Sequence, residues 1–214
     1  MSAPDPILVA VEVHPTGVVL RLDDGEELTI AADALPADLP DVGGSLGSPL
    51  LQRLRTAAAR KQAARRLFEL LARRLWTRQR LERKLTAEGL PPAAVTAVLD
   101  EAAARGIHSD RHVAEAYCRD ALRTRTVGRA WLVDRLRRLG VAGDLARQVV
   151  AAQLSPAEER DLARRAAASR WRRETAQDAR ALARVQRFLQ SRGFPAGICR
   201  EAAQDARPGG QAVD

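Results

Sequence analysis

The sequence contains three similar stretches that are rich in basic side chains. These side chains are the first candidates for a chemical role. The copies are "RLERKLTAEGL" (80–90), "WLVDRLRRLGV" (131–141) and "RVQRFLQSRGF" (184–194). A guanidinium group binds phosphate or carboxylate oxygens through two parallel hydrogen bonds, and its plane stacks on nucleic-acid bases. The three stretches therefore favour binding to a polyanion, either a nucleic acid or the acidic surface of a protein.

The candidate binding residues are those that lie off the apolar stripe of each copy. Each copy carries one apolar residue eight positions before its glycine and another four positions before it, and these should face a core. The basic residues outside that stripe are Arg78, Arg80, Arg83, Lys84, Arg129, Arg135, Arg137, Arg138, Arg184, Arg187 and Arg192. Repetition of the unit would place these three sets of basic residues on one side of the repeat array. For any single position, the alternative is a solvated arginine that binds no ligand.

Tryptophans flank the same basic stretches at positions 76, 131 and 171. An exposed indole could stack on a base. A tryptophan near a helix end more often packs between two structural units, and we expect that role for Trp76, Trp131 and Trp171.

Residue sets that carry catalysis or hold a metal are missing from the sequence. His108 and His112 are four residues apart, but no Cys, Asp or Glu completes a metal set at ligand spacing. The stretch "GGSLG" (43–47) lacks the Lys-Ser/Thr pair of a phosphate-binding loop. No plausible Cys–His pair occurs. We therefore expect no catalytic, cofactor or metal site, and a protein that is not an enzyme.

The charge is distributed unevenly along the 214 residues. The net charge of +8 combines about −8 in residues 1–50 with about +16 in the remainder. A segment that basic attracts polyanions. Of the 35 basic residues, only Lys61 and Lys84 are lysines. The codon usage of a GC-rich genome explains the preference for arginine over lysine. It does not explain the excess of positive charge, because such a genome also supplies Asp and Glu codons.

The location expected for the protein is the cytoplasm. No run of 18 apolar residues predicts a membrane span, and the N-terminus lacks the features of a secretory signal. Cys118 and Cys199 lie far apart in helical contexts and are predicted to be buried thiols in a reducing compartment.

Short apolar runs with β-branched residues predict three strands near the N-terminus. The runs are 7–13, 18–22 and 27–30, separated by "HPTG" and "DDG" turns. The following stretch, 35–49, is rich in Pro, Gly and Asp and is typical of a linker.

From Leu50 onward the apolar period changes from 2 to about 3.6, which predicts helices. The first helix is expected to run to Leu75 with Phe68 on its apolar face. Ser109 and the "SPAE" capping box at 155–158 mark later helix starts. The helices group into three units of about 50 residues, each a long helix, a short helix ending at Gly, and a third helix.

The predicted fold is mostly α: an elongated tandem array of three three-helix repeats with a small N-terminal β-rich extension. The predicted boundaries are a β-rich segment (1–34), a linker (35–50), repeats at 51–107, 108–154 and 155–206, and a disordered tail (207–214).

The sequence resembles the RecX family of recombinase regulators over about residues 58–205. The resemblance rests on "LLARRLWTRQRLERKLTAEGL" (70–90), on "RGIHSDRHVAEAYCRDALRTRTVGRAWLVDRLRRLGV" (105–141) and on 184–194. The middle stretch is similar to the family's Gly-apolar-x-Asp-(Asp/Ser) entry into the second repeat, here with His108 and Ser109 before Asp110, and it has Gly128 in the expected small-residue slot. It departs from the pattern at Val113, where the family often has Phe.

The resemblance implies a protein that binds RecA recombinase and RecA filaments on single-stranded DNA, with double-stranded DNA as a second candidate ligand. It implies modulation, expected to be inhibition, of filament extension, ATPase, strand exchange and co-protease activity in recombination, DNA repair and the SOS response. We expect a monomer without cofactors.

Two other classes of function stay open at this point. A stand-alone DNA-binding protein or transcription regulator, similar to helix-turn-helix proteins, could also use three-helix units, but should prefer a duplex sequence. A structural adaptor without DNA contact would show no salt-dependent DNA binding.

Overall fold

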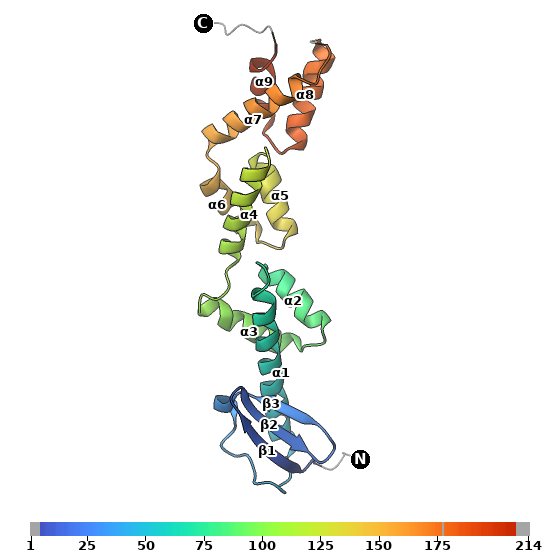
Figure 1. Ribbon diagram of the computed structural model, residues 1–214, viewed down its shortest axis with the longest axis vertical. Helices are drawn as coiled ribbons and strands as arrows, with labels where there is room; N and C mark the ends of the chain where they lie inside the picture. The colour runs from blue at the N-terminus through green and yellow to red at the C-terminus, as the bar shows by residue number, and fades with distance from the viewer. Residues whose placement is uncertain (1–4, 177, 209–214) are drawn as a thin grey trace. The chain divides into compact units, whose positions relative to one another are not determined.

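The computed structural model describes residues 5–176 and 178–208 of the chain (Figure 1). It contains two compact units, residues 1–108 and 109–214, and each is described by itself. The described part is mostly helical with a small N-terminal sheet, as the sequence predicts. The predicted disordered tail falls largely on residues 209–214, which lie outside the described residues. None of the described helices is both long and apolar enough to cross a membrane.

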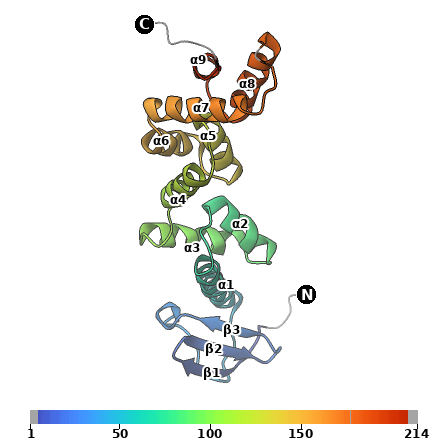
Figure 2. The same cartoon turned by 45° about the horizontal axis from the view of Figure 1, so that its top comes forward.

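A three-stranded antiparallel sheet opens the first unit. Strands β1 (Leu8–His14), β2 (Gly17–Leu22) and β3 (Glu27–Ile30) follow one another in the order β1-β2-β3, which confirms the predicted meander. One face of this sheet is buried together with Leu54 of the first helix. The helix supplies the apolar cover that a small sheet needs for stability in water (Figure 2).

Part of the predicted linker is attached to the sheet. The amide of Leu8 donates to the carbonyl oxygen of Gly44 at 3.0 Å, and the amide of Leu46 donates to that of Pro6 at 2.8 Å. Leu46 is fully buried, and the chain also makes a short 3₁₀ turn at Ala32–Ala34. Residues 43–46 are therefore a fixed part of the first unit, because their backbone completes one end of the β1 edge.

The first repeat consists of α1 (Ser48–Leu71), α2 (Arg78–Ala87) and α3 (Pro92–Ala104). Its core joins Leu67 of α1, Leu81 and Leu85 of α2, and Leu99 of α3. The repeated leucines of the short helix are thus fully buried, as predicted.

The expected length and face of the first helix need a correction. The helix ends at Leu71, so Leu75 lies in the following turn and is exposed. Phe68 is also exposed, because the core side of α1 is formed by Ala63, Leu67 and Leu70.

The second unit contains the other two repeats. The second repeat consists of α4 (Asp110–Thr124), α5 (Arg129–Arg138) and α6 (Gly143–Gln153). The third consists of α7 (Pro156–Trp171), α8 (Ala179–Ser191) and α9 (Ala196–Asp205). Ser109 accepts a hydrogen bond from the amide of His112, and the predicted capping box at Ser155 is complete.

Glycines end the short helix of every repeat in the left-handed conformation. Gly140 has φ of +95° after α5 and Gly193 has φ of +79° after α8. Backbone in this region is strained for residues with a Cβ atom, so glycine is the residue that lets each helix stop and reverse. The common ending seen in the sequence is therefore a turn requirement, separate from the arginines around it.

Candidate partner-binding surface

The basic residues of α2 divide into exposed side chains and side chains held by carboxylates. Arg80 and Arg83 are exposed, with no hydrogen bond or ion pair to the described residues. Arg78 is half-buried and pairs with Glu82 at 2.9 Å and with Asp100 at 2.7 Å. Hydrogen bonding to Asp100, more than that to Glu82, raises the pKa of Arg78. Arg78 thus ties α2 to α3, and the open positive charge belongs to Arg80 and Arg83.

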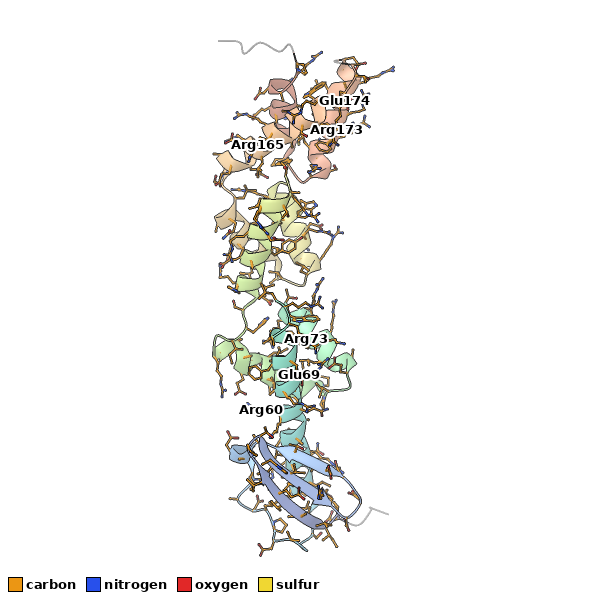
Figure 3. All side chains as sticks on the ribbon, in the orientation of Figure 1. Arg60, Glu69, Arg73, Arg165, Arg173 and Glu174 are labelled. Atoms are coloured by element: carbon orange, nitrogen blue, oxygen red, sulfur yellow. The ribbon has the colours of Figure 1, made fainter. Side chains whose placement is uncertain are left out.

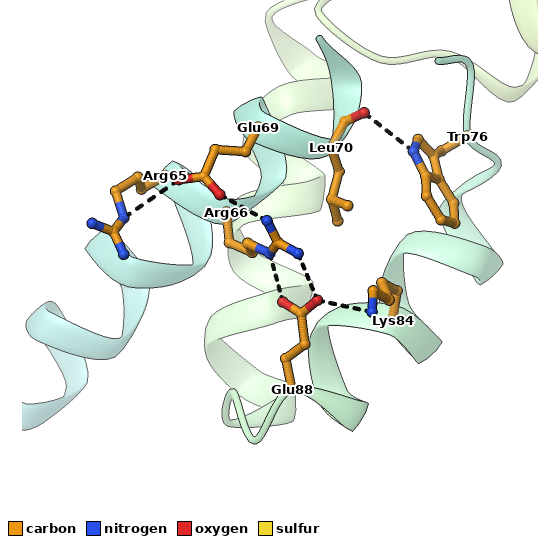
Figure 4. Close-up of polar contacts among 7 residues, drawn as sticks. All are labelled: Arg65, Arg66, Glu69, Leu70, Trp76, Lys84 and Glu88. Carbon is orange, nitrogen blue, oxygen red and sulfur yellow. Dashed lines mark hydrogen bonds and ion pairs between the residues drawn. The ribbon is translucent and has the colours of Figure 1, made fainter. Parts of the chain in front are cut away.

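Lys84 belongs to an ion-pair network that joins α2 to α1 (Figure 4). Its ammonium lies 3.1 Å from Glu88, which also accepts two hydrogen bonds from Arg66 at 2.7 and 2.9 Å. Arg66 extends the network to Glu69 at 2.7 Å. Hydrogen bonding from Arg66 lowers the pKa of Glu88 to about 2. Lys84 is consequently committed in part to holding the repeat together.

Arg129 of α5 is a structural residue, which corrects its prediction as an exposed one. Its guanidinium donates to the carbonyl oxygen of Leu154 at 2.8 Å, and its backbone amide donates to Glu159 at 2.7 Å. Glu159 is only 2% exposed, and its carboxylate lies 3.6 Å from the Arg129 side chain. A buried carboxylate needs such partners, since leaving it unpaired costs several kcal/mol, about 3–5.

The remaining predicted residues of α5 are exposed. Arg137 has no partner among the described residues, and Arg138 pairs with Asp134 at 3.0 Å. Arg135 lies over the ring of Trp131, 5.3 Å from its centroid. Surface ion pairs of this kind are weak, about 0–1 kcal/mol, so the pair adds little stability, although Asp134 offsets the charge of Arg138.

The predicted residues of α8 are mostly engaged. Arg184 donates twice to Glu174, at 2.9 and 2.7 Å, and this pairing lowers the pKa of Glu174. Arg192 donates to the carbonyl oxygen of Thr126 at 2.9 Å, which links the third repeat to the second. Arg187 alone is exposed, with a 3.3 Å hydrogen bond to the carbonyl of Ala183.

Arginines on α7 and just after it are open but were not predicted as binding residues (Figure 3). These exposed side chains, which have no hydrogen bond or ion pair to other described residues, are Arg160, Arg165, Arg172 and Arg173. At 1.5 Å per residue they span about 20 Å. The sequence contained a signal for them, because residues 160–173 hold six arginines and one acid. We call these four residues the α7 arginines.

Acids of the N-terminal segment neutralise part of α1. Arg55 donates to Glu26 at 3.0 and 2.6 Å, and Arg53 pairs with Asp38. Hydrogen bonding from Arg53 lowers the pKa of Asp38. The acidic segment therefore faces arginines of its own unit, on a helix outside the predicted set.

The tryptophans have separate roles. Trp171 is buried in the core of the third repeat and donates to the carbonyl oxygen of Ala203 at 2.9 Å, so packing between repeats was the wrong prediction for it. Trp76 donates to the carbonyl oxygen of Leu70 at 3.2 Å within the first repeat. Trp131 packs on the core of the second repeat, and its backbone lies against Gly193 of the third.

Within residues 5–176 and 178–208, no group of three or more His, Cys, Asp or Glu side chains could hold a metal ion. His108 is buried, and its Nε2 atom lies 2.8 Å from the carbonyl oxygen of Trp76. His108 thus contributes to the first repeat as a structural residue.

Comparison with known proteins relates the third repeat, and most of the chain, to one family. A model described as "RecX, third three-helix domain" matches residues 157–202. The regulatory protein RecX of Chromobacterium violaceum is 34% identical over 148 residues, which cover 68% of this chain and 91% of that protein. The RecX protein of Halorhodospira halophila is 37% identical over 154 residues, covering 70% and 92%.

Solved structures show the same fold. A crystal structure of a regulatory protein RecX matches 94% of this chain and 99% of its own, with a TM-score of 0.76 and 21% identity. The structure of RecX from Lactobacillus salivarius covers 70% of this chain and 97% of its own, with a TM-score of 0.65 and 17% identity.

Proposed function

The chain belongs to the RecX family of regulatory proteins, and from that premise we propose that it binds RecA recombinase and RecA filaments on single-stranded DNA. The binding inhibits filament extension, ATP hydrolysis, strand exchange and co-protease activity. The protein thereby restrains recombination, DNA repair and the SOS response in the cytoplasm. It acts as a binding protein and not as an enzyme.

The observation that carries this proposal is the set of arginines left open after the structural ion pairs are assigned. Arg80 and Arg83 on α2, Arg137 on α5 and the α7 arginines are exposed without carboxylate partners in the described chain. A guanidinium that is already exposed and unpaired loses no internal interaction when it binds an anion. These positions are therefore better candidates than Arg129, Arg184 or Arg192.

A nucleoprotein filament offers two kinds of anionic group to such a surface. Phosphates of the DNA backbone accept bidentate hydrogen bonds from arginine, and carboxylates on the protein subunits accept the same geometry. We assign the α7 arginines to phosphate contacts, because four unpaired guanidinium groups within about 20 Å suit the regular spacing of a backbone.

The experiment is a RecA ATPase assay on single-stranded DNA with the protein added below stoichiometric amounts. The proposal expects strong inhibition at these low ratios, because blocking the growing end of a filament affects many subunits. A variant with Arg165, Arg172 and Arg173 changed to Ala should inhibit less. Unchanged ATPase at every ratio would overturn the proposal.

A matched control separates a specific surface from total charge. Arg123, Arg138 and Arg147 are also exposed arginines of the second unit, but each pairs with an Asp of its own helix. Changing these three to Ala lowers the net charge by the same amount and should leave inhibition nearly intact.

The alternative is a stand-alone DNA-binding protein similar to helix-turn-helix regulators. Its support is the short second helix of each repeat, which carries exposed arginines. It predicts preference for one duplex sequence in competition binding and no effect on the recombinase. Duplex specificity together with unaltered ATPase would favour it.

A further inference from the structure

Trp131 differs from the other two tryptophans in the exposure of its indole N–H group. Trp76 donates this hydrogen to the carbonyl oxygen of Leu70 at 3.2 Å. Trp171 donates it to the carbonyl oxygen of Ala203 at 2.9 Å. The Nε1 atom of Trp131 has no acceptor in the described part of the chain, and it is not buried. A buried indole N–H usually finds an acceptor, so this edge of the Trp131 ring faces solvent.

Two arginines from different parts of the second repeat approach the ring of Trp131. The guanidinium carbon of Arg125, the residue after α4, lies 5.6 Å from the ring centroid, and that of Arg135 on α5 lies 5.3 Å from it. Both side chains are exposed, and neither makes a hydrogen bond or an ion pair with another described residue. Two positive charges without carboxylate partners therefore converge on one aromatic ring.

The ring of Trp131 is less closely covered than that of Trp76. The guanidinium carbon of Arg74 lies only 3.9 Å from the centroid of Trp76, which is the distance of a close stack. The two contacts at Trp131 are longer, and cation–π contacts of exposed arginines are weak. A ligand with an aromatic face can therefore replace them. Trp171 is buried, so Trp131 is the tryptophan whose ring is available to a ligand.

Contacts with two repeats hold Trp131 in place. Part of its ring packs on the core of the second repeat. Its backbone lies directly against Gly193 of the third repeat. The segment before it is fixed as well, because Arg192 donates to the carbonyl oxygen of Thr126 at 2.9 Å. An aromatic side chain that is already held in one position loses little conformational entropy when a ligand binds.

We infer that Trp131, Arg125 and Arg135 form a binding site for one unpaired nucleotide of a single strand. The base stacks on the indole, because every nucleobase has an aromatic face. The guanidinium groups bind the phosphates beside that base. Since each lies within 5.6 Å of the ring centroid, the two groups lie within about 11 Å of each other. The site rests on the proposed function, because single-stranded DNA is the ligand proposed there.

A site of this kind distinguishes a single strand from a duplex. The bases of a duplex are stacked on one another, so their faces are not accessible without unstacking. Phosphate contacts such as those assigned to the α7 arginines are available on both kinds of DNA. A carboxylate on a protein surface could also pair with Arg125 or Arg135, but it offers nothing that stacks on the ring of Trp131. The aromatic ring therefore gives the surface a preference for unpaired bases.

The test compares binding of the full chain to an oligothymidylate strand and to an abasic strand with the same number of phosphates. The natural protein should bind the thymidylate strand more tightly by about fivefold or more, because the stack with a base is lost on the abasic strand. Trp131→Leu removes the aromatic face and should bind the two strands alike. Its salt dependence should stay that of the natural protein, since the phosphate contacts remain. Equal affinity of the natural protein for both strands would overturn the proposal, as would a preference that survives in Trp131→Leu.

Two further variants keep the test independent of the folding of Trp131→Leu. Trp76→Leu is the matched control and should retain the preference for thymidylate, because Arg74 already covers that ring. Trp131→Phe keeps an aromatic face and should retain most of the preference. The thymidylate strand should quench the tryptophan fluorescence of the natural protein, and this quenching should be lost in Trp131→Phe. Quenching that persists in Trp131→Phe would contradict a stack on this ring.

The arginines of the site are tested by the salt dependence of binding to the thymidylate strand. Changing Arg125 and Arg135 to Ala should reduce the slope of log affinity against log salt by about 1.4, because two phosphate contacts are lost. Changing Arg138 and Arg147, which pair with Asp residues of their own helices, should reduce it less. Equal reductions would overturn the role of the arginines. These assays contain no recombinase, so a failure of the proposed function appears separately, as unaltered ATPase.

Discussion

Gly128 and Gly193 touch through their backbones, so that a Cβ atom on Gly128 would lie 2.4 Å from the carbonyl oxygen of Gly193. The Gly128 amide also donates to the carbonyl oxygen of Arg192 at 2.9 Å. The start of α5 in the second repeat therefore rests directly on the end of α8 in the third. Glycine is therefore needed at position 128 because the two backbones approach closely there, and not because the chain turns at this residue.

Gly128→Ala should destabilise the second unit by about 1–3 kcal/mol, the usual cost of forcing a methyl group into a packed site. The measurement is the free energy of unfolding in urea. Gly197→Ala in α9 is the control, since a Cβ there meets no atom within 4 Å. The control should be neutral or slightly stabilising, and equal losses for the two variants would contradict the role of the contact.

Glu159→Ala should cost about 3–5 kcal/mol, because it removes the carboxylate that pairs with Arg129 and leaves a half-buried guanidinium uncompensated. Glu158→Ala, one residue earlier, removes only the side chain that completes the exposed capping box and should cost about 1 kcal/mol. Chemical denaturation of both variants compares a buried pair with an exposed cap. A smaller loss for Glu159→Ala would count against this assignment.

The α7 arginines should determine the salt dependence of DNA binding. Each phosphate contact adds about 0.7 to the slope of log affinity against log salt for single strands. Changing Arg165, Arg172 and Arg173 to Ala should therefore reduce the slope by about 2, as measured by fluorescence anisotropy. The variant with Arg123, Arg138 and Arg147 changed to Ala should reduce it less; identical slopes would show that only total charge matters.

Acid should weaken the α1–α2 contact through Glu88. Its pKa in the folded protein is about 2, below the ordinary 4.5, because Arg66 hydrogen-bonds the carboxylate. A lowered pKa contributes stability that is complete above about pH 4.5 and is lost as pH falls toward 2. Unfolding measurements should show the stability gap between the natural protein and Glu88→Gln shrinking over this window. A gap independent of pH would contradict this linkage.

Neutralising acids of the first unit should release arginines of α1 for DNA. Glu26→Gln with Asp38→Asn removes the partners of Arg55 and Arg53 and should steepen the salt slope by up to about 1.4 for single strands. Asp33→Asn with Asp41→Asn changes the net charge equally but releases no arginine. Anisotropy titrations of both variants compare their affinities for single-stranded DNA. Equal gains in affinity would indicate that only the change in net charge matters, and not the release of Arg53 and Arg55.

The sequence was sufficient to predict the elements that depend on local interactions. Alternating valines predicted the strands, the 3.6-residue period predicted the helices, and capping residues such as Ser109 and Ser155 placed their starts. The recurring Leu and Gly of the short helices were also assigned correctly, because burial of one stripe and reversal after a left-handed glycine are properties of a single segment.

Which arginines remain open was decided by the tertiary structure. The stripe of α5 left Arg129 on its outer side, yet Glu159, thirty residues later, comes from α7 to hold it. Arg192 likewise reaches Thr126 in another repeat, whereas Arg165 and Arg173 stay unpaired. The short helices alone could not reveal this, because their periodicity identifies the side facing away from a core but not the neighbour that arrives there.

The sequence by itself determined the repeat, its helices and its excess of positive charge, since each follows from composition or from neighbours within a few turns. Only the tertiary structure decided that Gly128 is a contact point, that Arg129 and Arg192 are held by other elements, and that the α7 arginines stay open. The physical reason is that ion pairs and close packing depend on which distant residues meet, and long-range pairing leaves no periodic trace in a single chain.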